Sequence, residues 1–140
     1  METTVEKKRF KTFVYHTDLA WTENKSGILS AADKPDLHVA APPEFKGEPG
    51  VWTPEDFFVA SLSVCFMTTF MTFASRARLS VRSYRESAEG VLEFVNDHYQ
   101  FTHSVLKPEI LVGSHDEIAV AEQVTQKAHE HCLIANSMKT

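Results

Sequence analysis

The sequence predicts an α+β fold in a single domain of residues 1–140. Short segments with strand-like alternation come first, a long apolar helix follows, and further strand-like segments precede a second helix. Strands and helices that come in runs, rather than in strict alternation, are typical of α+β proteins. A chain of 140 residues with 43% hydrophobic residues also has the usual size of one domain with its own core.

The first third of the chain is predicted to be mostly β. Over residues 10–21, the large side chains lie at even spacings, which indicates a half-buried strand: Phe13, Tyr15, Leu19 and Trp21. Residues 23–27 (ENKSG) contain Asn and Gly, which tolerate the backbone of tight reversals, so we expect a hairpin loop there. Residues 28–29 and 37–40 are short strand candidates on either side of a turn.

A strong helix start follows residues 41–52, a loop rich in Pro and Gly. Thr53 suits the N-cap, Pro54 suits the first helical position, and two acids follow at the positive end of the helix dipole. The helix is expected to run to about Arg78. It is apolar on nearly every face, so we expect it to be central and partly covered by a second copy of the chain in a homodimer.

The remainder is predicted to be strands followed by a helix. Strand-like runs cover residues 81–86, 91–95, 99–106 and 110–112, with a break at Gly90 and a turn at residues 96–97. Ser114 is the expected N-cap of a second helix that runs to about Cys132.

Composition argues against two classes of partner. The net charge of −5 disfavours the broad positive face of nonspecific nucleic-acid binders. The most apolar stretch, residues 57–73, is interrupted by Ser and Thr and falls short of the ~20 apolar residues of a membrane span. Two cysteines in a chain with a charged start fit a reducing cytoplasm, where we expect the protein to be located.

The two cysteines, Cys65 and Cys132, stand 67 residues apart, without zinc or CxxC spacing. One interpretation is that both are small buried core residues. The other is a redox pair in which one thiolate attacks an oxidant and the other thiol condenses with the sulfenic acid. His129 and His131 flank Glu130 near Cys132, but residues two apart on a helix face different directions and no HExxH pattern is present, so we expect no metal site.

Three segments together resemble the OsmC/Ohr family of osmotically induced and organic-hydroperoxide-resistance proteins. Residues 54–67 (PEDFFVASLSVCFM) resemble the family signature around its first cysteine. Residues 128–137 (AHEHCLIANS) are similar to the segment around the second, and residues 42–47 (PPEFKG) are similar to the OsmC-like branch.

The resemblance implies an OsmC-like fold, in which two chains intertwine as a homodimer with long helices at the centre and curved antiparallel sheets outside. It also implies reduction of organic hydroperoxides, with Cys65 as the peroxidatic residue, Cys132 as the resolving residue and a cellular dithiol as reductant. No metal or organic cofactor is required. Glu55 matches the family glutamate that helps hold a catalytic arginine.

Helix geometry separates Glu55 from Cys65 within one chain. Ten helical residues span roughly 15 Å, so a Glu55 that serves a thiol site serves one completed by a partner chain. The alternative is that Glu55 is only a dipole acid at the start of the helix, worth about 0.5 kcal/mol.

The sequence departs from the family pattern in the first hairpin, where Lys25 stands near the position of the family arginine. Lysine supplies charge without the planar, bidentate geometry of arginine. Lys25 is therefore either a catalytic substitute or a solvated loop residue, and other arginines are alternative sources of the charge: Arg9, Arg76, Arg78, Arg82 and Arg85. A catalytically weak dimer that binds a small lipophile is the competing function.

The large apolar residues of the first helix have two roles to fill. Most belong to the core, and some are expected to wall a pocket for an alkyl hydroperoxide tail: Phe57, Phe58, Phe66, Met67, Phe70 and Met71. Phe45 and Trp52, on the loop before the helix, are the expected rim of that pocket.

Overall fold

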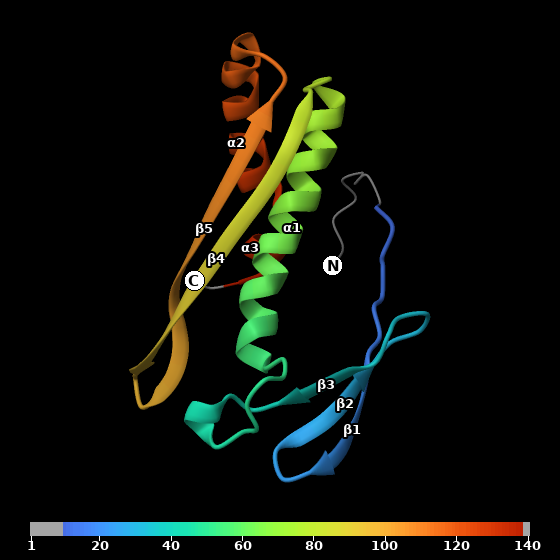
Figure 1. The fold of residues 1–140 in the computed structure, drawn as a ribbon, viewed down its shortest axis with the longest axis vertical. Helices are drawn as coiled ribbons and strands as arrows, with labels where there is room; N and C mark the ends of the chain where they lie inside the picture. Colours follow the sequence, from blue (N-terminus) through green and yellow to red (C-terminus); the bar gives the residue numbers. More distant parts are fainter. Residues whose placement is uncertain (1–9, 139–140) are drawn as a thin grey trace, which may run out of the picture. The chain divides into compact units, whose positions relative to one another are not determined.

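The computed structural model describes residues 10–138 and confirms the α+β class, with antiparallel sheets (Figure 1). Its contacts divide the chain into an N-terminal unit that ends at Trp52 and a C-terminal unit that begins at Thr53. The elements in order are β1 (Asp18–Glu23), β2 (Ser26–Ser30), β3 (Leu37–Ala40), η1 (Pro43–Phe45), α1 (Pro54–Arg76), β4 (Val81–Val95), β5 (His98–Val112), η2 (His115–Glu117), α2 (Ile118–His131) and α3 (Leu133–Asn136).

The N-terminal unit holds a three-stranded antiparallel sheet in the order β1-β2-β3. The predicted hairpin is confirmed: Asn24 takes a left-handed φ of 49°, and Glu23 pairs with Ser26 across the turn. The indole Nε1 of Trp21 donates to the Asn24 carbonyl at 2.8 Å. This bond ties the strand end to the turn.

The prediction of a half-buried strand over residues 10–21 is wrong in extent and burial. The strand covers only Asp18–Glu23, and all six of its residues are exposed. The even spacing of Leu19 and Trp21 does place them on one face, but in the described chain that face is uncovered, and Trp21 is 74% exposed.

The loop over residues 41–52 contains the short helix η1 and folds tightly on itself. The Gly47 N–H donates to the Pro42 carbonyl at 3.0 Å. A Cβ atom at Gly47 would lie 1.6 Å from the Ala41 carbonyl oxygen, so the turn requires glycine here. Trp52 then forms a parallel bridge with Val39, which returns the chain to the edge of the sheet.

The start of α1 is closed by a capping box. The Asp56 N–H donates to Thr53 Oγ1, and the Thr53 N–H donates to Asp56 Oδ2, each at 3.0 Å. Pro54 occupies the first turn, as predicted. Because both bonds satisfy N–H groups that have no partner inside the helix, the start of α1 is set locally.

Replacing Thr53 with alanine is expected to lower the free energy of unfolding by about 1 kcal/mol, because the helix loses its side-chain acceptor and leaves a half-buried N–H unpaired. Urea unfolding followed by circular dichroism measures the loss. Thr53→Ser keeps the hydroxyl and should retain most of the stability. Equal losses in both variants would contradict the role of the cap.

The C-terminal unit pairs the long strands β4 and β5 as an antiparallel hairpin, which runs alongside α1 in Figure 1. The predicted turn at residues 96–97 is confirmed. The predicted break at Gly90 is wrong, since β4 continues through it. A Cβ at Gly90 would lie 2.9 Å from the Phe101 ring and from the Val59 side chain, so this glycine allows close packing rather than ending a strand.

The core of this unit forms where α1, α2 and the hairpin meet. Phe70 is fully buried and contacts the ring of Tyr84, with 5.6 Å between centroids. Ala74, Val124 and Ala128 belong to the same buried cluster. The predicted second helix is present but begins later than Ser114, because η2 precedes α2.

Candidate thiol site

Cys65 lies in the middle of α1, which packs against the short helix α3. The residue is 8% exposed. Burial raises the pKa of its thiol, but hydrogen bonds outweigh burial and bring the pKa below its ordinary value. These bonds come from the Ile134 N–H, the Cys132 thiol, the Thr69 hydroxyl and the Leu133 N–H.

Cys132 lies between α2 and α3. Its extended backbone (φ −67°, ψ 106°) ends α2, and the same residue is the N-cap of α3. The residue is 2% exposed. Burial raises the pKa of its thiol, against the lowering effect of the Ala135 and Ile134 N–H groups, and the neighbouring Cys65 raises it further.

The fold therefore brings together two cysteines that are 67 residues apart in sequence, each affecting the pKa of the other, and no disulfide joins them. The pKa of Cys65 is lowered and that of Cys132 is raised, so of the two sulfurs Cys65 is the one that ionises more readily. Such an arrangement provides a nucleophilic sulfur with a second thiol beside it.

Alkylation should separate the two thiols by pH. Cys65 is expected to react with iodoacetamide at a lower pH than free cysteine does, because its thiolate is stabilised. Cys132 should require a higher pH than free cysteine does. Peptide mapping after alkylation across a pH series measures each rate. Parallel pH profiles for the two residues would contradict the assignment.

A cavity of about 610 Å³ reaches Cys132. Apolar residues from α1 and β5 form part of its wall, including Leu62, Phe66 and Leu106, and Ser104, Gln126 and His129 add polar groups. Of the six aromatic and methionine residues predicted for a pocket wall, Phe66 lines this cavity. Phe45 and Trp52, the predicted rim, lie in the N-terminal unit.

Glu55 is in the first turn of α1, and the unbroken helix between it and Cys65 maintains the separation of roughly 15 Å within one chain. Its Oε1 atom is buried and has no hydrogen-bond partner among residues 10–138. Burial of a carboxylate oxygen is costly unless a donor reaches it. The described residues of the chain therefore supply no hydrogen-bond donor to the buried Oε1 of Glu55.

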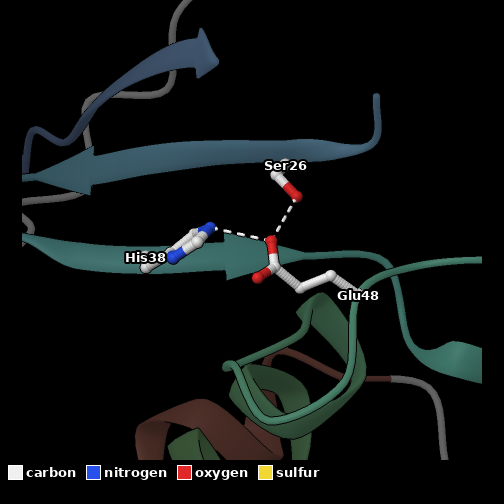
Figure 2. Close-up of polar contacts among 3 residues, drawn as sticks. All are labelled: Ser26, His38 and Glu48. Carbon is white, nitrogen blue, oxygen red and sulfur yellow. Dashed lines mark hydrogen bonds and ion pairs between the residues drawn. The ribbon is translucent and has the colours of Figure 1, made fainter. Parts of the chain in front are cut away.

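Lys25 supports the loop of the N-terminal unit. Its Nζ donates to the Phe45 carbonyl at 2.8 Å. The same loop is held by Glu48, whose Oε1 accepts from Ser26 Oγ at 2.8 Å and lies 3.0 Å from His38 Nε2 (Figure 2). Residues 45–48 are thereby held by side chains from β2, from β3 and from the turn at Lys25.

The other predicted sources of positive charge have different outcomes. Arg9 lies outside the described residues. Arg76 lies over the Phe73 ring, 5.4 Å from its centroid. Arg78, Arg82 and Arg85 are exposed. The groups that lower the pKa of Cys65 within the described chain are neutral donors instead.

Two features of the site were missed by sequence reasoning. Thr69 could have been found, because it follows Cys65 by four residues and so lies on the same helix face. The N–H groups of Leu133 and Ile134 could not, because a backbone donor leaves no mark in residue type. In the part of the chain that the structure describes, no group of three or more His, Cys, Asp or Glu side chains could hold a metal ion.

Comparison with known proteins places the chain in a family. Residues 47–140 match the family model described as OsmC-like protein. An uncharacterized protein of Bacillus subtilis strain 168, YmaD, is 21% identical over 105 residues, which cover 72% of this chain and 69% of that protein.

Solved structures share the fold over nearly the whole chain. An OsmC-like protein of unknown function from Vibrio cholerae has a TM-score of 0.84 at 24% identity, covering 92% of this chain and 96% of that one. A Legionella pneumophila protein described as an organic hydroperoxide resistance protein OsmC has a TM-score of 0.72 at 25% identity, covering 91% and 92%. The family match, which includes both cysteines, carries the conclusion: the chain belongs to the OsmC-like family.

Proposed function

We propose that this protein reduces organic hydroperoxides with its two thiols. The Cys65 thiolate attacks the terminal oxygen of the hydroperoxide, the O–O bond breaks, and the alkoxide leaves and is protonated to the alcohol. Cys65 is then a sulfenic acid. Cys132 attacks that sulfur, the S–O bond breaks, water leaves, and a Cys65–Cys132 disulfide forms. A cellular dithiol reduces the disulfide and restores both thiols.

The observation that carries this proposal is that the fold brings the two buried thiols together, with donors around Cys65 that lower its pKa while the pKa of Cys132 is raised. A buried cysteine in a purely packing role has no need of several donors to its sulfur. Here the donors favour the thiolate of Cys65, and Cys132 lies close enough to affect its pKa, so we expect the disulfide to form with little rearrangement. The names of relatives such as the Legionella pneumophila protein agree with a hydroperoxide substrate.

A homodimer is part of the proposal, and two observations support it. α1 leaves large apolar side chains in solvent, among them Val64 at 56% exposed, and Met67 and Met71. The buried, unpaired Oε1 of Glu55 also needs a donor. We expect a second copy to cover the helix and to bring a donor to Glu55, with both units of each chain forming one OsmC-like domain over residues 1–140.

The proposal treats α1 as the core helix of a soluble protein in the cytoplasm. The expectation that the apolar stretch falls short of a membrane span does not hold for the whole helix, because α1 (Pro54–Arg76) is by length and composition alone long and apolar enough to cross a membrane. Its capping box and its packing against α2 and the β4–β5 hairpin are features of a core helix.

The competing function, a weak or inactive dimer that binds a small lipophile, has one observation in its favour. Lys25 uses its ammonium group to hold the Phe45 carbonyl. A lysine engaged in this way serves loop structure. Lys25 is a catalytic residue only if Lys25→Met slows the reaction with the peroxide while the variant remains folded.

Steady-state turnover tests the proposal. The purified protein is mixed with cumene hydroperoxide and dithiothreitol, and loss of peroxide and formation of cumyl alcohol are measured together. Catalytic consumption with one alcohol formed per peroxide supports the proposed function. Binding of the peroxide without turnover would favour the competing one.

The cavity beside Cys132 is expected to hold the alkyl part of the substrate. Ser104→Phe should fill part of it and lower kcat/KM for cumene hydroperoxide by about tenfold, and by less for the smaller tert-butyl hydroperoxide. Ser104→Ala, which removes the hydroxyl and adds no volume, is the matched control. Equal losses for both substrates would mean that the cavity does not determine substrate size.

A further inference from the structure

Thr69 presents its hydroxyl to the sulfur of Cys65. The two residues lie one helical turn apart in α1, and Thr69 Oγ1 is 3.9 Å from Cys65 Sγ. This distance is within the range of hydrogen bonds to sulfur, an acceptor larger than oxygen. When the sulfur is a thiolate it carries no proton, so the threonine hydroxyl must be the donor.

Neighbouring threonines of the same helix behave differently. The Thr68 hydroxyl donates to the Cys65 carbonyl at 3.1 Å, and the Thr72 hydroxyl donates to the Thr68 carbonyl at 2.9 Å. Both follow the usual pattern in which helical Ser and Thr bond back to the preceding turn. The Thr69 hydroxyl instead contacts the cysteine side chain.

The surroundings of Cys65 make a neutral donor important. Cys132 is the titratable group that interacts with it. The other ionisable groups on elements packed against α1 have other environments. On α2, His131 contacts the Phe73 ring, Lys127 lies over the same ring, His129 lines the cavity, and Glu122 and Glu130 are exposed. On the β4–β5 hairpin, Glu86 accepts from Tyr84, and the other ionisable side chains are exposed: Arg82, Arg85, Glu89, Glu93, His98, Tyr99, His103, Lys107 and Glu109.

We propose that Thr69 is a positioning residue for Cys65: its hydroxyl stabilises the thiolate and holds the sulfur toward α3, where the amides of Leu133 and Ile134 and the thiol of Cys132 reach it. The threonine completes a set of neutral donors around the charge. A hydrogen bond to a charged acceptor is stronger than one to its neutral form, so the hydroxyl favours the thiolate over the thiol.

The proposal is tested by the reactivity of Cys65 without any peroxide. Iodoacetamide alkylation of Cys65, resolved by peptide mapping, is measured from pH 5 to pH 10 in the wild type and in Thr69→Val, which removes the hydroxyl at nearly constant volume. We expect alkylation near pH 7 to slow by about three- to tenfold and its pH profile to move upward. Thr69→Ser should restore the wild-type profile.

Thr68→Val is the matched control, because it removes a hydroxyl that bonds only to the backbone and should leave the Cys65 profile unchanged. If the Thr69→Val chain fails to fold, as judged by circular dichroism, Thr69→Ala takes its place beside Thr69→Ser. An unchanged profile on loss of the Thr69 hydroxyl, or an equal shift in Thr68→Val, would overturn the proposal.

This inference deepens the proposed function and can fail separately from it. A protein that does not turn over cumene hydroperoxide could still show the Thr69-dependent alkylation of Cys65. Conversely, a working peroxidase whose Cys65 profile ignores Thr69 would retain the proposed function and lose this role. In an active enzyme, Thr69→Val should lower the rate of thiol oxidation at pH 7 by a factor similar to its effect on alkylation.

Discussion

Replacing Cys65 with serine is expected to abolish turnover of cumene hydroperoxide, with a loss on the order of a thousandfold or more. The serine hydroxyl keeps its proton at neutral pH, so the variant has no thiolate to attack the O–O bond. The donors that stabilise the Cys65 thiolate cannot make up for the lost thiol. They act on a group that already ionises readily, whereas a serine hydroxyl keeps its proton even beside them. The measurement is peroxide consumption in the presence of dithiothreitol.

The control for this variant is its stability. Serine is close to cysteine in size, but Cys65 is buried in α1, so thermal unfolding must show that the variant is folded at the assay temperature. Cys132 should remain a free thiol in Cys65→Ser after treatment with one equivalent of peroxide. Turnover at the wild-type rate would remove Cys65 from the mechanism. Rapid loss of the Cys132 thiol would reverse the assigned roles.

Replacing Cys132 with serine is expected to preserve the first reaction with peroxide and to stop the cycle there. Cys65 should be oxidised to a sulfenic acid that persists, because the thiol that would condense with it is missing. Trapping with dimedone, followed by mass spectrometry, measures the sulfenic acid on Cys65. Steady-state turnover with dithiothreitol should fall. The size of the loss measures how poorly the external thiol replaces Cys132.

The pairing of the thiols also affects the rate of that first step. The Cys132 side chain helps to lower the pKa of Cys65; Cys132→Ser keeps a donor group at this position, and Cys132→Ala does not. Oxidation of Cys65 should therefore be slower in Cys132→Ala than in Cys132→Ser. A wild-type level of steady-state turnover in both variants would remove Cys132 from the mechanism.

Features set by neighbours in sequence were predicted well. The start of α1 follows from Pro54 in the first turn and from Thr53 and Asp56, whose two hydrogen bonds to each other join residues three apart. The turns at Asn24 and at residues 96–97 likewise follow from residue types that tolerate a positive φ. In these places the interaction energy is local, so a short stretch of sequence contains the relevant partners.

Features that depend on distant contacts were predicted poorly. Gly90 looked like a strand break, yet its missing side chain leaves room for Phe101 and Val59. The alternation over residues 10–21 indicated a buried face that the described chain leaves exposed. The pairing of Cys65 with Cys132 was open from spacing alone, and the family resemblance, rather than any local pattern, indicated it.

The most direct test of the two-thiol mechanism is the bond that one equivalent of cumene hydroperoxide produces in the reduced wild-type protein. Non-reducing peptide mapping, with free thiols blocked at timed intervals, detects the product. We expect both thiols to disappear together and the peptides that contain Cys65 and Cys132 to appear joined by a disulfide, with one cumyl alcohol formed for each bond. Two thiols that survive excess peroxide for hours would contradict the mechanism.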